Sequence, residues 1–141
     1  MPVCILRATG RSFDIEWFVA SLESNPKSVF KPGRDLYVGQ VADEFGFIFT
    51  IGHGSIEEEI PHAIAFLRQH QGELTHLKAW SGVDTVTLEF GWDCPYGRTV
   101  RIYNRFPPDL LSECAALGIG IEVLLYFVDE SEFKRPVISQ T

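Results

Sequence analysis

The segment from Phe106 to Phe127 constrains the fold of this chain more than any other segment. Its sequence, FPPDLLSECAALGIGIEVLLYF, predicts a helix that ends at a glycine and leads directly into a buried strand. Pro107 and Pro108 have φ fixed near the helical value and lack the amide hydrogens that a first turn leaves unpaired. Gly118 supplies the left-handed residue that ends many helices. Between these ends, four apolar residues recur at helical spacing: Leu110, Leu111, Cys114 and Leu117.

Residues 119–128 form a nearly unbroken run of β-branched, aliphatic and aromatic side chains. Such a run is typical of a strand that is covered on most of both faces. We therefore predict that residues 119–128 form an interior strand of a sheet and that the preceding helix packs back on it.

The length and the cysteine content predict one reduced domain. A chain of 141 residues with 45% hydrophobic residues buries enough surface for a core without metal or disulfide staples. The three cysteines are odd in number and far apart, so neither a disulfide framework nor a zinc clip is indicated. We expect three reduced thiols in a cytoplasmic protein: Cys4, Cys94 and Cys114.

Charge and hydropathy exclude two classes of partner. The net charge is −7 and is spread evenly along the chain, without a basic block. This disfavours nucleic acid, whose binding depends on neutralising phosphates. No apolar run approaches the ~20 residues that span a bilayer, and the first ten residues are too short for a signal peptide, so no membrane association is expected.

The other patterns predict short strands and two more helices. Ser12 or Asp14 caps a helix that buries Ile15, Phe18, Val19 and Leu22, and Ser55 with Glu58 forms a capping box for a helix that ends near Gly72. Pro61 either starts that helix or kinks it. Residues 74–81 are expected to be a connection. The predicted strands are Pro2–Ala8, Ser28–Lys31, Leu36–Val38, Phe45–Ile51, Thr85–Phe90 and Thr99–Phe106.

Together these elements predict a single α+β domain over residues 1–141. Phe45, Phe47, Phe49 and Ile51 alternate onto one face and give the core an aromatic wall. The last two strands of the list are expected to form a hairpin around a turn at residues 92–97. We expect a mostly antiparallel sheet with three helices packed mainly on one face, and a surface tail at residues 129–141.

This pattern resembles a family of small uncharacterised bacterial domains, known as a domain of unknown function. The resemblance is strongest over residues 55–127, and the segments around Asp14 and from Pro26 to Gly33 are also similar. It rests on the acidic helix start at residues 55–59, the hairpin, and the passage from Leu110 through Gly118 to Tyr126. This chain departs from the family in its longer aromatic strand at residues 45–51 and in Glu122. The resemblance implies the fold and supplies no catalytic residues.

No constellation of residues predicts catalysis, a metal or a cofactor. The Gly52–Ser55 turn leads from a strand into a helix start, but Glu57, Glu58 and Glu59 would repel a phosphate there. Glu58 and His62 are four residues apart, yet no second pair completes a metal site. Cys94 is a thiol in a predicted turn with no assignable base.

A binding face is the best candidate for a functional site. Alternation places Arg101, Tyr103 and Arg105 together on the side of their strand opposite to the core. Thr85, Thr87, Glu89, Glu122 and Tyr126 are expected on the same polar side of the sheet, either as a binding patch or as an ordinary solvated face. Arginine and tyrosine are enriched where proteins bind partners.

We therefore expect a cytoplasmic, non-enzymatic module of the accessory or immunity type that binds another protein. The alternative is a small enzyme whose site is assembled near Cys94, His53 or the Gly52–Ser55 turn. A third possibility is self-association through the same sheet face or through an exposed sheet edge.

Overall fold

The computed structural model describes residues 3–12, 18–20, 28–33, 35–37, 40–41, 43–80, 82–95 and 104–129. Five strands form one sheet in the order β2-β5-β1-β6-β7, and β3 with β4 forms a separate two-stranded sheet. The strands are β1 Val3–Gly10, β2 Ser28–Phe30, β3 Asp35–Tyr37, β4 Gln40–Val41, β5 Phe45–Gly52, β6 Thr85–Pro95 and β7 Gly120–Val128.

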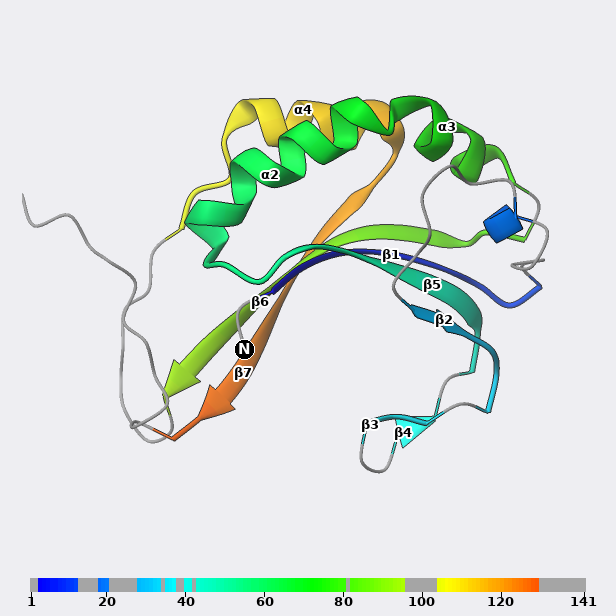
Figure 1. Cartoon of the computed structure of the whole chain (residues 1–141), viewed down its shortest axis with the longest axis horizontal. Helices are drawn as coiled ribbons and strands as arrows, with labels where there is room; N and C mark the ends of the chain where they lie inside the picture. The colour runs from blue at the N-terminus through cyan, green and yellow to red at the C-terminus, as the bar shows by residue number, and fades with distance from the viewer. Residues whose placement is uncertain are drawn as a thin grey trace, which may run out of the picture.

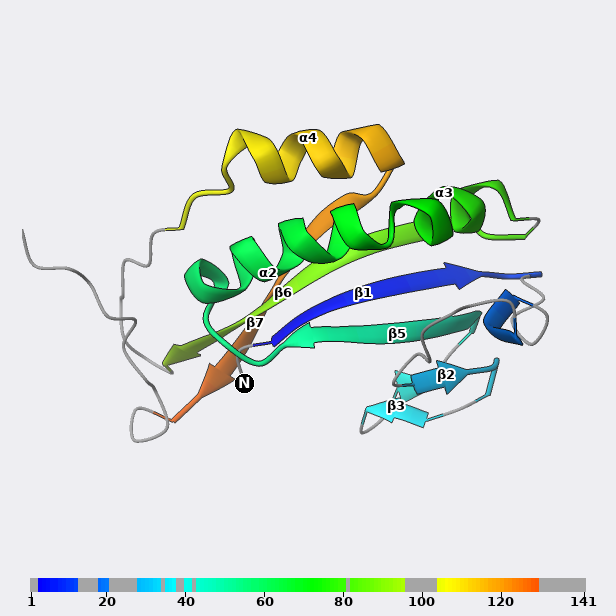
Figure 2. The ribbon, with the colours of Figure 1, turned by 45° about the horizontal axis from the view of Figure 1, so that its top comes forward.

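Three helices lie on one side of the five-stranded sheet, which we call the helix side (Figures 1 and 2). They are α2 Ile56–Gln69, α3 Gln71–Ala79 and α4 Pro108–Leu117. The predicted fold class, an α+β domain with a mostly antiparallel sheet and three helices mainly on one face, is confirmed. Residues 18–20 of the predicted first helix are helical, and its other residues lie outside the described ranges.

Strand β1 is the centre of the sheet and pairs antiparallel with β5 on one side and β6 on the other. Strand β7 pairs parallel with β6. Two parallel neighbours need a crossover connection, and α4 supplies it, so β6, α4 and β7 form a βαβ unit.

The predicted hairpin is wrong in the part of it that is described. Strand β6 continues through the predicted turn to Pro95, and its neighbours are β1 and β7. Residues 104–107 at the end of the predicted return strand are not a strand, and residues 96–103 lie outside the described ranges. Asp93 and Pro95 resemble turn residues, but proline is tolerated where a strand has a free edge. Among the described strands, none pairs with β6 on that side beyond Gly91.

The core lies between the sheet and the helices. Alternate residues of the three central strands are completely or almost completely buried there: Cys4, Leu6, Ala8, Phe47, Val86, Leu88 and Phe90. Phe18 stacks on Phe47 with their ring centroids 5.7 Å apart. The predicted aromatic wall of β5 is confirmed, with Phe45, Phe49 and Ile51 packed against this core.

Helix α2 begins at Ile56, which settles the question raised by Pro61. The Ser55 side chain accepts a hydrogen bond from the Glu58 amide, and three glutamates occupy the first turn, where the helix dipole favours negative charge. Pro61 lies inside the helix and takes away one i→i−4 donor.

Residues 71–79, predicted mainly as a connection, form helix α3 instead. Only Leu74 and Leu77 of this helix are buried, so it carries little of the periodic apolar pattern that identifies a helix in a sequence.

Helix α4 and its end follow the prediction closely. Gly118 has φ 67°, its amide donates to Ala115, and the Ile119 amide donates to Cys114 at 2.8 Å. These are the two bonds of a Schellman motif. Leu110, Cys114 and Leu117 are buried as predicted, whereas Leu111 is 47% exposed.

The prediction of an interior strand at residues 119–128 is wrong. Among the described strands, β7 stands at the end of the strand order and pairs with β6. Its burial alternates between half-buried and exposed positions, and none of its nine residues is fully buried. An apolar composition favours neighbours on both sides, but the connection through α4 places β7 outside β6, whose other side β1 already occupies.

Candidate interaction surface

Three large apolar side chains of β7 are exposed on the helix side of the sheet. Val123 is 40% exposed, Leu125 is 52% exposed and Phe127 is 60% exposed. We call these three residues the apolar strip. They follow one another at every second position, about 7 Å apart along the strand. In the β6–β7 register they lie beside Phe90, Trp92 and Cys94.

Leu125 and Phe127 of the strip lie where β6 and β7 extend beyond the described part of β1. Within the described residues, β1 pairs with β6 as far as Val3 and Gly91, while β6 and β7 stay paired as far as Pro95 and Val128. Figures 1 and 2 show the ends of these two strands running out from beneath the three helices. In the described part of the chain, the sheet therefore ends in a two-stranded ribbon that carries the exposed residues of the apolar strip.

The sequence contains a pattern that is consistent with this exposed surface, namely an uncharged stretch between two acidic residues. Residues 123–128 carry no charge, and carboxylates stand at both ends of the stretch, at Glu122 and Asp129. Both acidic residues are exposed. An uncharged stretch between exposed acids is as consistent with a strand that a partner covers as with one that the core covers.

Only Arg105 of the predicted arginine–tyrosine face lies within the described residues. Arg101 and Tyr103 lie outside the described ranges. Arg105 is exposed, but it lies in the non-strand segment before α4 rather than on a strand. The role of Arg101, Tyr103 and Arg105 in binding stays a prediction.

The other polar residues predicted for that face do not form an open patch. Thr87 and Glu89 are 5% and 1% exposed. Arg7 of β1 forms an ion pair with Glu89 of β6, at 3.2 Å between Nη1 and Oε2. Burial raises the pKa of the Glu89 carboxyl, nearby Glu122 raises it further, and Arg7 opposes the rise. Thr85 and Glu122 are exposed, whereas Tyr126 is half-buried.

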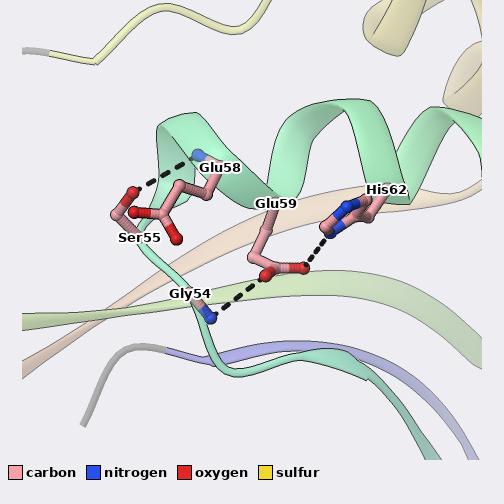
Figure 3. Close-up of polar contacts among 5 residues, drawn as sticks. All are labelled: Gly54, Ser55, Glu58, Glu59 and His62. Atoms are coloured by element: carbon pink, nitrogen blue, oxygen red, sulfur yellow. Dashed lines mark hydrogen bonds and ion pairs between the residues drawn. The ribbon is translucent and has the colours of Figure 1, made fainter.

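The turn between β5 and α2 is held together by the buried carboxylate of Glu59 (Figure 3). Its Oε1 accepts a hydrogen bond from the Gly54 amide at 3.0 Å, and its Oε2 lies 3.2 Å from Nδ1 of His62. A Cβ at Gly52 would overlap this carboxylate, and one at Gly54 would come within 2.7 Å of it. The glycines of this turn thus make room for Glu59, which takes the Gly54 amide that a phosphate would need.

Glu59 and His62 have the geometry of a carboxylate that orients an imidazole, but neither Ser55 nor Cys4, which lie near them among the described residues, is an available nucleophile. Ser55 uses its hydroxyl to cap α2. Cys4 is completely buried, and burial together with the charge of Glu59 raises the pKa of its thiol to about 12. A thiol in this state is not a nucleophile at neutral pH.

The other candidates for catalysis do not come together. Among the described residues, no hydrogen bond or ion pair joins the side chain of His53 or Cys94 to a second titratable group. Cys94 is half-buried in β6, and burial raises the pKa of the Cys114 thiol to about 11. Within the described ranges, no three histidine, cysteine, aspartate or glutamate side chains are placed to hold a metal ion.

A small recess lies where α2 meets α3, between Phe49, Phe66 and the pair His70–Glu73. The His70 Nδ1 and Glu73 Oε1 atoms are 2.9 Å apart. The recess is open to solvent and has room for little more than a water molecule, so it does not have the size of a ligand pocket.

No protein-family model, curated protein or solved structure matches this chain. The resemblance over residues 55–127 therefore stays a prediction. No helix in the described part of the chain is long and apolar enough to span a lipid bilayer.

Proposed function

We propose that this protein is a non-enzymatic protein-interaction module whose binding surface is the apolar strip of β7. The observation that carries the proposal is the exposure of Val123, Leu125 and Phe127 next to one another on a regular strand. Single exposed apolar residues are ordinary on any protein surface, whereas contiguous ones mark sites of interaction. A role of the accessory or immunity type, which acts by binding another protein, is compatible with this surface.

The enzymatic alternative has less support. The buried thiols of Cys4 and Cys114 have raised pKa values. The Glu59 carboxylate is engaged by Gly54 and His62. These groups hold the fold together, and the recess beside His70 offers no room for a substrate.

Site-specific cross-linking in the cells that make the protein tests the proposal. A photo-reactive amino acid is placed at Leu125 in one variant and at Ala65, an exposed residue of α2, in the control variant. We expect a defined protein to be cross-linked from position 125 and not from position 65.

The cross-linked protein is then purified and its affinity measured directly. It should bind the unmodified chain and lose at least tenfold in affinity for Leu125→Lys, while Ala65→Lys keeps full affinity. Equal cross-linking from both positions, or undiminished binding by Leu125→Lys, would contradict the proposal.

A further inference from the structure

We infer that the recess at the junction of α2 and α3 binds the positively charged end of a primary aliphatic amine. This site goes beyond the proposed function, because the lining of the recess comes from β5, α2, α3 and the segment at residue 18. Three observations carry the inference: the aromatic rings around the recess, the carboxylate beside them and the size of the space.

Among the described residues, five aromatic side chains line the recess: Phe18, Phe47, Phe49, Phe66 and His70. In that order, the ring centroids of successive residues are 5.7, 5.4, 6.1 and 4.5 Å apart. The planes of successive rings are inclined by 11°, 81°, 53° and 42°, so the rings surround the space from several directions. The face of a phenyl ring is negative and attracts a cation.

The carboxylate of Glu73 brings a negative charge to the same place. Glu73 lies in the first turn of α3 and lines the recess. The Nδ1 atom of His70 is 2.9 Å from Oε1 of Glu73, so this contact uses one of the two carboxylate oxygens. An ionised carboxylate has about four acceptor positions, and its hydrogen bonds are stronger than those of a neutral acceptor. Glu73 therefore has the capacity to accept a further N–H donor.

The size of the recess decides which cation fits. The space holds little more than a water molecule, and an ammonium group is close to a water molecule in size. A quaternary ammonium group or a guanidinium group is much larger. A potassium ion is small enough, but proteins hold it with several oxygen ligands. Among the described residues that line the recess, only Glu73 has oxygen in its side chain.

A primary ammonium group matches both parts of the lining. One N–H donates to the Glu73 carboxylate, and the rest of the charge lies against the phenyl rings. The recess is open to solvent, so the aliphatic part of the molecule extends outward. The recess thus takes one charged end of a molecule and not a whole ligand. A free aliphatic amine and the lysine side chain of another protein offer this same chemistry.

Titration of the full chain with n-butylammonium chloride, followed by nuclear magnetic resonance, tests the inference. The measurement is made at pH 8, where an alkylammonium ion is charged and an ordinary imidazole is neutral. We expect the ring signals of Phe49 and Phe66 to shift and to saturate, with a dissociation constant on the order of 1–10 mM. Tetramethylammonium and potassium chloride at the same concentrations should leave these signals unchanged.

One variant removes the charge of the site. Glu73→Gln keeps the shape of the side chain and should weaken the binding of n-butylammonium about tenfold or more. Glu57→Gln is the matched control, because it removes an exposed carboxylate from the first turn of α2 and should leave the affinity unchanged.

A second variant removes a ring and keeps an apolar side chain. Phe66→Leu should weaken the binding about threefold or more, because leucine has no negative face. Thermal unfolding checks that the variant is folded, and Phe49→Leu makes the same test on β5 if it is not.

Each contrary result overturns a stated part of the inference. Equal affinity of Glu73→Gln and the wild type excludes the ion pair, and equal affinity of the folded leucine variant excludes the rings. Shifts that do not saturate, or that tetramethylammonium or potassium produces equally, exclude a site for a primary ammonium group.

A short neutral peptide with one lysine and blocked ends distinguishes the two sources of the ammonium group. If the peptide binds at least as tightly as n-butylammonium, the site accepts the lysine side chain of another protein. If the peptide binds tenfold more weakly while n-butylammonium saturates the site, the ligand is a free amine. If neither of them binds, the inference fails.

Discussion

The compositions of β1 and β7 suggest an edge strand and a central strand, respectively, but the sheet has them the other way round. Strand β1 contains Arg7 and Thr9, yet it is the middle strand, and its Cys4, Leu6 and Ala8 are completely buried. Strand β7 contains one charged residue and seven apolar or aromatic ones, yet it is an edge strand. The more apolar of the two strands is the more exposed.

The difference shows that an apolar composition indicates side chains that favour burial but does not indicate which element buries them. Strand β1 is central because β5 and β6 both pair with it, whatever its polar residues do on the other face. Strand β7 lies at the edge because α4 returns the chain to the outer side of β6. Val123 and Leu125 of β7 stay 40% and 52% exposed beside β6, and this exposure is the basis of the proposed binding surface.

The largest expected effect is the difference in stability when the same substitution, leucine to alanine, is made in each of the two strands. Leu6→Ala in β1 removes a completely buried side chain and should lower the free energy of unfolding by about 2–5 kcal/mol. Leu125→Ala in β7, where the side chain is 52% exposed, should cost about 1 kcal/mol or less. Urea denaturation of both variants measures this difference. Equal losses would mean that the strip is buried within the protein.

A smaller effect is expected at the end of β5, opposite β1. Gly52 pairs with Cys4, and a side chain there would overlap the Glu59 carboxylate. Gly52→Ala should therefore destabilise the fold by roughly 1–3 kcal/mol. Gly72→Ala is the matched control, because nothing lies within 4 Å of its added methyl group, and it should stabilise helix α3 by about 0.4–1 kcal/mol.

A double variant distinguishes crowding from a general intolerance of this turn. Glu59→Ala removes the carboxylate that fills the space beside Gly52, so the loss in Gly52→Ala with Glu59→Ala should be smaller than the sum of the two single losses. A strictly additive loss in thermal or urea unfolding would show that Gly52 is required for a reason other than Glu59.

A pH effect is expected at Glu89, which lies between Arg7 of β1 and Glu122 of β7. Its pKa is raised in the folded state, chiefly by burial. The folded state therefore binds the proton more tightly than the unfolded state does. The stability from this group is fully present below the carboxyl's ordinary pKa and is lost as the pH rises through the raised pKa.

Glu89→Gln should remove this dependence. Relative to the variant, the wild type should lose stability as the pH rises from about 4 toward neutrality. Glu122→Gln should weaken the same dependence, because the Glu122 charge adds to the rise in the pKa of Glu89. Unfolding curves across this pH range check both variants. A wild type that gains stability over the variant as the pH rises would mean that Arg7 outweighs burial.

The sequence predicts the helices and their ends well, but it predicts less well which strands pair with one another in the sheet. The helix at residues 108–117, its end at Gly118 and the cap at Ser55 depend on nearby residues and were predictable. The parallel pairing of β6 with β7 depends on contacts between residues about 33 positions apart, which no local pattern specifies. Helix α3 was missed because only Leu74 and Leu77 mark its buried side.

The apolar strip illustrates the same limit for the candidate site. Val123, Leu125 and Phe127 were predictable as side chains that share one side of a strand, from alternation alone. Their exposure was not, because it depends on where β1 and α4 end relative to β7. Glu59 was likewise hidden among three consecutive glutamates, since its burial depends on the two glycines that make room for it.

Hydrogen exchange compares the two strands without altering either of them. From Ile5 to Thr9, β1 pairs with β5 on one side and with β6 on the other. Each of its amides therefore faces a paired strand and should exchange slowly. Strand β7 has β6 on one side, so amides directed at β6 should be protected and those directed at the outer edge should exchange quickly. We expect an alternating pattern over residues 121–125, with slow and fast amides in turn.

This pattern is also the most direct measure of the outer edge in solution. Uniformly slow exchange along β7 in a dilute sample would contradict an open edge. It would show that another part of the same chain protects the outer amides of β7. If the protection of the fast amides increases with protein concentration, a second copy of the chain protects them. If a protein that cross-links to position 125 protects those amides while the exchange in β1 is unchanged, that protein covers β7.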